Sequence, residues 1–150
     1  MTREKIKKLD DVMAPPYDII SEEQQEELYK NHPKNYVRLI LNKIQQTDDD
    51  RNNRYTRAKK LYDEWLSDST LIKSDRVAIF VYKIYYKLEG SNKTMNGFFV
   101  LLKIDPDYKV VKAHERTLSK PKADRLNLTR ACKSNLEPVQ LLYVHKKDEI

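Results

Sequence analysis

The sequence predicts an α+β fold in which a mixed or antiparallel sheet with a central hairpin is backed by about three helices. Two runs rich in β-branched and aromatic residues, 77–88 and 95–104, are separated by turn-forming residues at 89–93, which is the pattern of a hairpin. Apolar residues occupy both parities of each run, so we expect both faces of these strands to be covered. Helices packed on the sheet are the usual cover in such a fold.

Length and composition limit the class of protein. The 150 residues are enough for one domain with a buried core, and no repeat or flexible linker divides residues 1–150. The hydrophobic share of 39% and the charged share of 35% are typical of a folded, strongly charged chain. Only two glycines are present, which excludes a Walker or dinucleotide-type phosphate loop. A single cysteine, Cys132, and the lack of a membrane-length apolar run or a secretory signal lead us to expect a cytoplasmic protein.

The first part of the chain is predicted to begin with a flexible arm or an edge strand over residues 1–12. Two prolines fix their own φ angles, so residues 14–18 are expected to form a stiff, non-helical loop. Ser21 and Gln24 have the spacing of a capping box, which predicts a helix that lasts to about Lys30.

The clearest predicted element is a helix over residues 55–66. Its apolar stripe of about 140° is the width of a core-facing surface, and acidic residues 48–50 are candidate N-caps. The stripe consists of Tyr55, Ala58, Leu61, Tyr62, Trp65 and Leu66. The remaining predicted elements are a β-prone run at 36–41, a strand at 109–113, a helix at 122–135 and a last strand at 139–144.

The net charge of +6 is concentrated in one segment. Residues 112–133 contain seven basic residues against two acidic ones. This concentration favours an anionic partner, either a phosphorylated small molecule or a nucleic-acid backbone, and the alternative is a solvated basic face of a surface helix. The segment has no aromatic residue, so stacking on bases is not expected there.

The chemistry-bearing residues are densest at 114–125, between a predicted strand and a predicted helix. Pro121 suits the first position of that helix, whose free amides would face the preceding loop and form an anion site. His114 and Glu115 supply an imidazole and a carboxylate that could act as acid or base or hold magnesium. The alternative interpretation is a structural loop held by an ion pair to a nearby arginine.

Four segments of the chain, taken together, resemble a known family. They are residues 14–21 (APPYDIIS), 35–39 (NYVRL), 114–117 (HERT) and 122–126 (KADRL) through Asn135. In this order they resemble the bacterial and archaeal family catalogued as domain of unknown function ten-fifteen, from about Ala14 to Tyr143. Members of that family are longer and carry a later Asp-Gly-His-His-Arg motif that resembles one in ParB-like proteins, a group that includes free-serine kinases. The resemblance implies that this chain, which lacks the motif, is the N-terminal portion of a longer family protein.

The resemblance implies a nucleotide-dependent phosphotransferase acting on a small metabolite, with free serine the first candidate and ATP or ADP with Mg as cofactors. The implied phosphate- or substrate-binding residues are Tyr17, Asp18, Arg116, Thr117, Lys120, Lys122, Arg125 and Asn135. The implied catalytic residues are His114, Glu115 and Asp124, with Glu115 or Asp124 holding magnesium or accepting a proton and His114 orienting one of them.

Two other functions stay open on the sequence. One is a ParB-like, nucleic-acid-associated binding module that uses the same basic segment on DNA phosphates. The other is a non-catalytic fragment or subunit that needs a partner chain or a second copy, which an exposed apolar sheet face would favour. In the phosphotransferase hypothesis, we expect His114 and Glu115 to converge on residues 15–18 and form one site.

Overall fold

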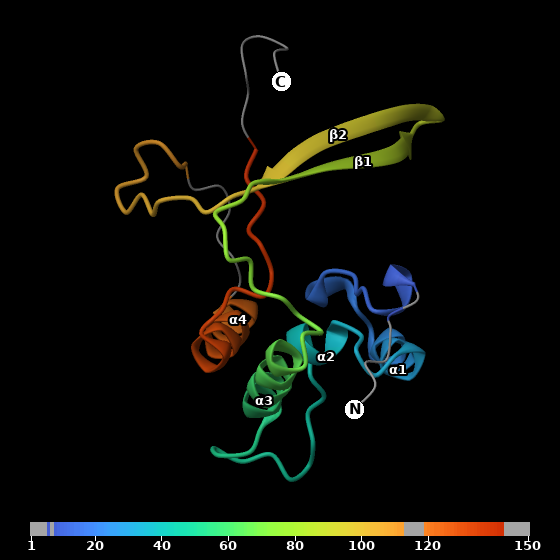
Figure 1. The fold of residues 1–150 in the computed structure, drawn as a ribbon, viewed down its shortest axis with the longest axis vertical. Helices are drawn as coiled ribbons and strands as arrows, with labels where there is room; N and C mark the ends of the chain where they lie inside the picture. Colours follow the sequence, from blue (N-terminus) through green and yellow to red (C-terminus); the bar gives the residue numbers. More distant parts are fainter. Residues whose placement is uncertain (1–5, 7, 113–118, 143–150) are drawn as a thin grey trace. The chain divides into compact units, whose positions relative to one another are not determined.

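The computed structural model describes residue 6, residues 8–112 and residues 119–142, and it confirms an α+β fold with an antiparallel hairpin (Figure 1). The chain forms two compact units, residues 1–71 with 119–150 and residues 72–118, which are treated separately below. The first unit contains the 3₁₀ turns η1 (Leu9–Asp11) and η2 (Tyr17–Ile19) and the helices α1 (Glu22–Asn31), α2 (Val37–Ile40), α3 (Arg54–Ser67) and α4 (Ser119–Cys132). The second contains β1 (Phe80–Leu88) and β2 (Ser91–Phe99). None of the described helices has the length and apolar character needed to cross a membrane.

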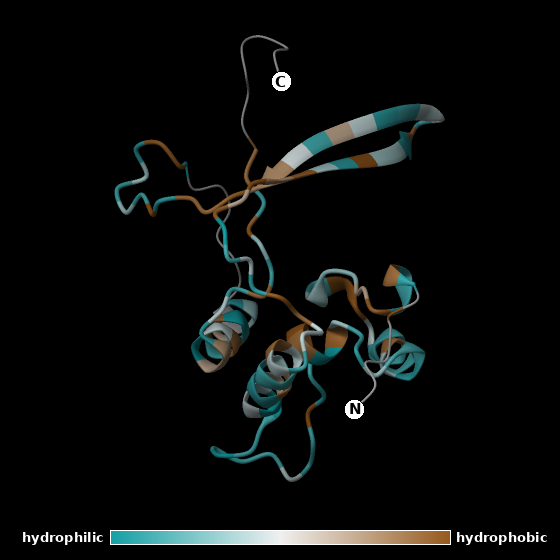
Figure 2. Cartoon of the chain, in the orientation of Figure 1, coloured by the Kyte–Doolittle hydropathy of each residue, from teal (hydrophilic) through white to brown (hydrophobic). Residues whose placement is uncertain are grey.

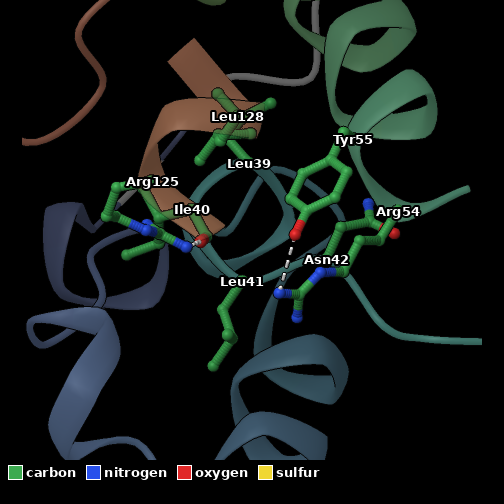
Figure 3. A pocket seen from close by; sticks show the side chains of 8 residues that line it. All are labelled: Leu39, Ile40, Leu41, Asn42, Arg54, Tyr55, Arg125 and Leu128. Atoms are coloured by element: carbon green, nitrogen blue, oxygen red, sulfur yellow. Dashed lines mark hydrogen bonds between the residues drawn. The ribbon is translucent and has the colours of Figure 1, made fainter. Parts of the chain in front are cut away.

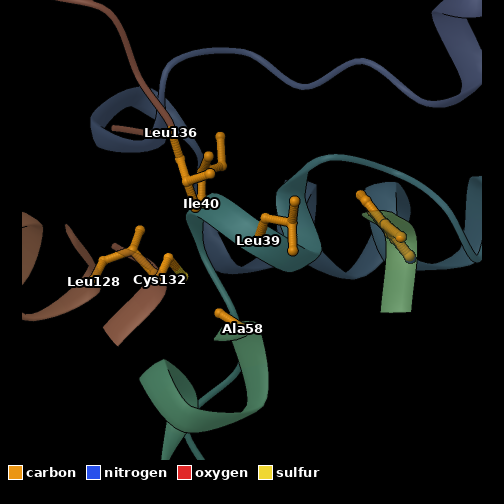
Figure 4. Close-up of a cluster of buried hydrophobic side chains, with 7 residues drawn as sticks. Leu39, Ile40, Ala58, Leu128, Cys132 and Leu136 are labelled. Carbon is orange, nitrogen blue, oxygen red and sulfur yellow. The ribbon is translucent and has the colours of Figure 1, made fainter. Parts of the chain in front are cut away.

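The core of the helical unit forms where α2, α3 and α4 meet. Its buried side chains are Leu39, Ile40, Ala58, Trp65, Leu128, Cys132 and Leu136 (Figure 4). The predicted stripe of α3 is largely confirmed, because Ala58 and Trp65 are buried and the flanking tyrosines pack against the core, whereas Leu66 is exposed at its edge. The opposite surface of α3 is polar, as Figure 2 shows in teal.

The capping box predicted for α1 is present. The Ser21 hydroxyl accepts a hydrogen bond from the Gln24 amide at 3.2 Å, and the Gln24 side chain accepts one from the Ser21 amide at 3.1 Å. The N-cap expected for α3 at 48–50 is wrong. Asn53 caps that helix instead, since its side-chain oxygen accepts from the amides of the first turn.

Three segments predicted to be non-helical contain short helical turns. Residues 9–11 form η1, so an edge strand is wrong at these positions. Residues 17–19 form η2 directly after the prolines, because a proline can precede a helical turn and Pro16 accepts a hydrogen bond from Ile19 at 3.2 Å. The β-prone run 36–41 contains α2, where burial of its apolar residues outweighs their strand propensity.

Asn35 is a fully buried side chain that holds the N-terminal segment against α2. Its amide nitrogen donates to the carbonyls of Asp11 and Met13, both at 2.9 Å, and its oxygen accepts from Val37 at 3.0 Å. The Tyr36 amide also donates to Val12 at 2.8 Å. The last residues of the predicted arm are therefore tied to the core.

The hairpin is confirmed, with a tighter turn and shorter strands than predicted. Leu88 pairs with Ser91, so Glu89 and Gly90 form a two-residue turn in which both φ angles are positive, at 48° and 76°. Two positive φ values are the signature of a type I′ turn, whose twist matches that of the paired strands. The strands span nine residues each.

Within these bounds, the expectation that both faces are covered is wrong. The register places eight apolar or glycine residues on one face, which we call the apolar hairpin face: Phe80, Tyr82, Ile84, Tyr86, Leu88, Met95, Gly97 and Phe99. The Tyr82 ring covers Gly97 and lies 5.0 Å from the Phe99 ring. The apolar residues of mixed parity that suggested two covered faces lie mostly outside the paired strands.

Two further strands predicted near the C-terminal half are wrong over their described parts. Residues 109–112 follow a turn in which the Asp105 carboxylate accepts from the amides of Val110 and Val111, and residues 139–142 are irregular. The basic helix predicted at 122–135 begins and ends three residues earlier, as α4. It ends because Lys133 has a φ of 52°, which breaks the helical path.

Replacing Asn35 with alanine should lower the free energy of unfolding by about 3 kcal/mol, because two partly buried hydrogen bonds to carbonyls and one buried hydrogen bond from an amide are lost. Urea denaturation followed by circular dichroism measures this loss. The control is Asn127→Ala on the exposed surface of α4, which should change stability by less than about 0.5 kcal/mol. Equal effects of the two variants would contradict the role of Asn35.

The free energy of unfolding should also fall as the pH is lowered from about 4 to about 2 because of Asp68. Hydrogen bonds from Lys34 and Thr70 lower the pKa of Asp68 to about 2, below its ordinary value of 3.8. A carboxyl with a lowered pKa stabilises the fold above its unfolded-state pKa, and that contribution disappears as it is protonated. An NMR carboxyl titration should give the low pKa, and Lys34→Met should raise it. An unchanged pKa in that variant would contradict the assignment.

Candidate functional site

Arg125 lies at the centre of a polar cluster in the helical unit. Its guanidinium donates to the Ile40 carbonyl at 2.8 Å and forms ion pairs with Asp124 and Glu137. The same group stacks on the Tyr17 ring, 3.7 Å from the ring centroid. Its side chain is 22% exposed, so these partners replace most of its contact with water. A single side chain thus joins η2, the end of α2 and the segment after α4.

Asp124 connects this arginine to the start of α3. One carboxylate oxygen accepts from the Tyr55 hydroxyl at 2.7 Å and from Arg54, and the other accepts from Arg125 at 3.0 Å. The side chain is 13% exposed. We name the six side chains Tyr17, Arg54, Tyr55, Asp124, Arg125 and Glu137 the Arg125 cluster. Its two guanidinium and two carboxylate groups balance in formal charge.

The segment that carries Glu137 is fixed from two sides. The Tyr17 amide donates to the Glu137 carboxylate at 3.3 Å, and the Tyr36 hydroxyl donates to the Leu136 carbonyl at 2.7 Å. Burial raises the pKa of Tyr36 to about 12, so the hydroxyl remains a proton donor throughout the ordinary pH range. The Arg125 cluster is therefore built on anchored backbone.

A small hollow lies beside the cluster (Figure 3). Its volume is about 10 Å³, which is room for one water molecule. It is lined by Leu39, Ile40, Leu41, Asn42, Arg54, Tyr55, Arg125 and Leu128. A nucleotide does not fit into this hollow in the conformation described.

A much larger, open groove adjoins the hollow. It has a volume of about 640 Å³, within the range of small-molecule sites, and runs along the start of α1 and residues 41–44. The groove and the hollow share Leu41, Asn42 and Arg54 as lining residues. Arg54 therefore lies where the open groove meets the Arg125 cluster.

The structure places the predicted site residues in three different situations. Arg125, Asp124 and Tyr17 come together in the Arg125 cluster. Asp18, Lys122 and Asn135 are exposed at the surface. His114, Glu115, Arg116 and Thr117 lie outside the described residues, as does the side chain of Lys120. Catalysis by His114 and Glu115, and magnesium at Glu115, stay predictions.

The expectation that residues 15–18 approach the 114–125 segment has support at one point. Tyr17 stacks on Arg125, so the proline-rich loop meets the first half of α4. His114 and Glu115 are not described, and a single site that includes them stays a prediction. Pro121 is the third residue of α4, not the first, because the helix begins at Ser119.

Sequence reasoning missed three members of the cluster. Tyr55 was assigned to the core stripe alone, although its hydroxyl reaches Asp124. Arg54 and Glu137 carry no recognisable motif, since their partners are far away in the sequence. Only the tertiary fold brings these groups together.

Two chemical possibilities find no support among the described residues. No group of three or more His, Cys, Asp or Glu side chains in this part of the chain is arranged to hold a metal ion. Cys132 is buried, and burial raises the pKa of its thiol, which disfavours the reactive thiolate.

Arg125→Lys should lower the free energy of unfolding by about 2 kcal/mol, because an ammonium cannot keep the forked hydrogen bonds and the stacking on Tyr17 together. Tyr17→Leu should lower the free energy of unfolding less in the Arg125→Lys variant than in the native chain. A double-mutant cycle measured by urea denaturation would show this coupling. The matched control is Arg130→Lys, at an exposed position of the same helix, and it should leave the free energy of unfolding almost unchanged. Strict additivity of the Tyr17 and Arg125 substitutions would contradict the coupling.

Comparison with known proteins gives one finding. No curated protein and no solved structure matches the chain. One family model matches residues 1–150, the whole length, and its description is a protein of unknown function. The motifs quoted from residues 14–135 resembled the same family, and the chain belongs to the family of proteins of unknown function designated DUF1015.

Proposed function

We propose that the chain is part of a nucleotide-dependent phosphotransferase that acts on a small metabolite, with free serine the first candidate. In this proposal, phosphates bind at the basic segment 114–125 and the start of α4. The observation that carries the proposal is the stacking of Tyr17 on Arg125. Two segments far apart in the sequence, each quoted for the family resemblance, thereby meet beside the most basic part of the chain.

In this proposal, Arg125 and Lys122 have different roles. Arg125 already balances two carboxylates, so its first task in the proposal is to position the loop that carries Tyr17. Lys122 is exposed, and none of the ion pairs among the described residues includes it. Lys122 is therefore the residue best able to contact a phosphate directly.

The groove beside the cluster supports a small-molecule ligand. Its volume is adequate for a nucleotide or a metabolite, and Lys43 and Arg54 are the basic residues in its lining. Glu22, Glu23 and Glu26 line the same groove and would repel phosphates. An anionic end of the ligand is therefore expected near Arg54, which is also where the groove meets the Arg125 cluster.

The acid–base and magnesium roles fall mainly to His114 and Glu115 in this proposal. Asp124 accepts hydrogen bonds from two arginines and from Tyr55, which leaves it little capacity to take a proton or bind a cation. Magnesium, when bound with the nucleotide, would neutralise phosphate charge during transfer.

Thermal unfolding with ATP or ADP plus magnesium, in parallel with L-serine and phosphoserine, tests the proposal. A ligand at one hundred times its dissociation constant stabilises a protein by about 2.7 kcal/mol, which should raise the melting temperature by roughly 5–10 °C. Lys122→Ala should abolish the shift. Lys60→Ala, on the exposed surface of α3, removes the same charge elsewhere and should keep it. The absence of any shift with nucleotide, or equal loss in both variants, would contradict the proposal.

A ParB-like, nucleic-acid-associated module is the second candidate, and the outer surface of α4 favours it. Lys122 and Arg130 are exposed on α4 and Lys133 is exposed directly after it, and none of the three takes part in an ion pair with a described residue. Three phosphate contacts predict that the logarithm of the DNA-binding constant falls with the logarithm of salt concentration with a slope of about −3. Fluorescence anisotropy with short duplex DNA measures that slope. Salt-independent binding, or none, would exclude this candidate.

A further inference from the structure

The apolar hairpin face has no cover among the described residues of the 72–118 unit. Five of its side chains, Phe80, Ile84, Tyr86, Leu88 and Phe99, are 44% to 61% exposed. The only described strands or helices of this unit are β1 and β2 themselves. An isolated two-stranded hairpin is at best marginally stable in water, so this face needs a partner surface.

The opposite face of the hairpin has a different character. It carries Lys83, Lys87, Asn92, Thr94 and Asn96 along most of its length, with Val81, Tyr85 and Phe98 as its apolar members. A polar face of this kind is well suited to water. Polar side chains outnumber apolar ones on this face by five to three, so the apolar hairpin face is the one in greater need of a cover.

We propose that the apolar hairpin face binds the same face of a second copy of this chain, sheet against sheet. Along this face, the Phe80–Phe99 pair and Tyr82 lie toward the open end of the hairpin, Ile84 and Met95 lie at its middle, and Tyr86, Lys93 and Leu88 lie toward the turn. A two-fold axis through the middle of the face would place Ile84 and Met95 against the same residues of the other copy, the Phe80–Phe99 pair against Leu88, and Tyr82 against Tyr86. The face is in this sense self-complementary.

Charge and area support a second copy as the occupant. Lys93, near the turn, is the one charged residue that the register places on this face, so the surface that covers it should be nearly as apolar. Five large side chains, each about half exposed, offer roughly 500 Å² per copy, and two copies therefore bury roughly 1,000 Å². This is the lower limit for a specific interface, which predicts a weak dimer. The inference does not rest on the proposed function.

Sedimentation equilibrium of the full chain over about 5 to about 500 µM tests the proposal. The average mass should rise with concentration from one chain to two. Ile84→Lys places a charge in the middle of the apolar hairpin face and should weaken the dimer at least about tenfold. Tyr85→Lys, the next residue of the same strand, points to the opposite face and should leave the dimer unchanged.

Three results would overturn the proposal. A single-chain mass over the whole range means that no second copy binds, and loss of thermal stability in monomeric Ile84→Lys would then identify a cover within the same chain. Equal weakening by both variants would indicate pairing of strand edges instead of faces. Should Ile84→Lys fail to fold by circular dichroism, the milder Ile84→Ala takes its place, and an unchanged dimer in that variant counts against the interface.

Discussion

The helical unit depends on the placement of one guanidinium group. Arg125 is mostly buried and carries five N–H donors, and it finds acceptors on the end of α2, on its own helix and on the segment after α4. Leaving such a charge without partners would cost several kcal/mol, so the surrounding segments are constrained to stay near it. The Tyr17 ring adds a flat apolar surface against which the group stacks. The turn η2 and the segment after α4 are therefore held by the same side chain.

In the proposed function, ligand binding and folding would be coupled at Arg125 but separate at Lys122. Any ligand that drew Arg125 onto a phosphate would have to displace Glu137 or Asp124, and so would loosen the loop that carries Tyr17. Lys122 lies one turn away at the surface and forms no ion pair with a described residue. A substitution at Arg125 would therefore change both the stability of the fold and the affinity for a ligand, whereas a substitution at Lys122 would change the affinity alone.

Local signals in the sequence account for much of the fold. The capping box of Ser21 and Gln24, the apolar stripe of α3 and the turn of the hairpin are encoded within a few residues, and each is present. The burial of α2 in the core is a tertiary effect, and for this reason strand propensity alone gives the wrong secondary structure at residues 37–40. The candidate site was harder to predict. Asp124 and Arg125 stood out by charge, but Arg54, Tyr55 and Glu137 reach them only after folding.

The hairpin shows how strand bounds change a prediction of burial. Counted over the longer runs of the sequence, apolar residues fell on both faces, but the paired strands exclude the flanking apolar residues. Over the paired residues, the alternation is that of a sheet with one apolar and one polar face. A cover on one side fits a surface that associates with one partner. Because this surface and the basic surface of α4 belong to different units of the chain, substitutions can test the proposed assembly and the proposed anion binding independently.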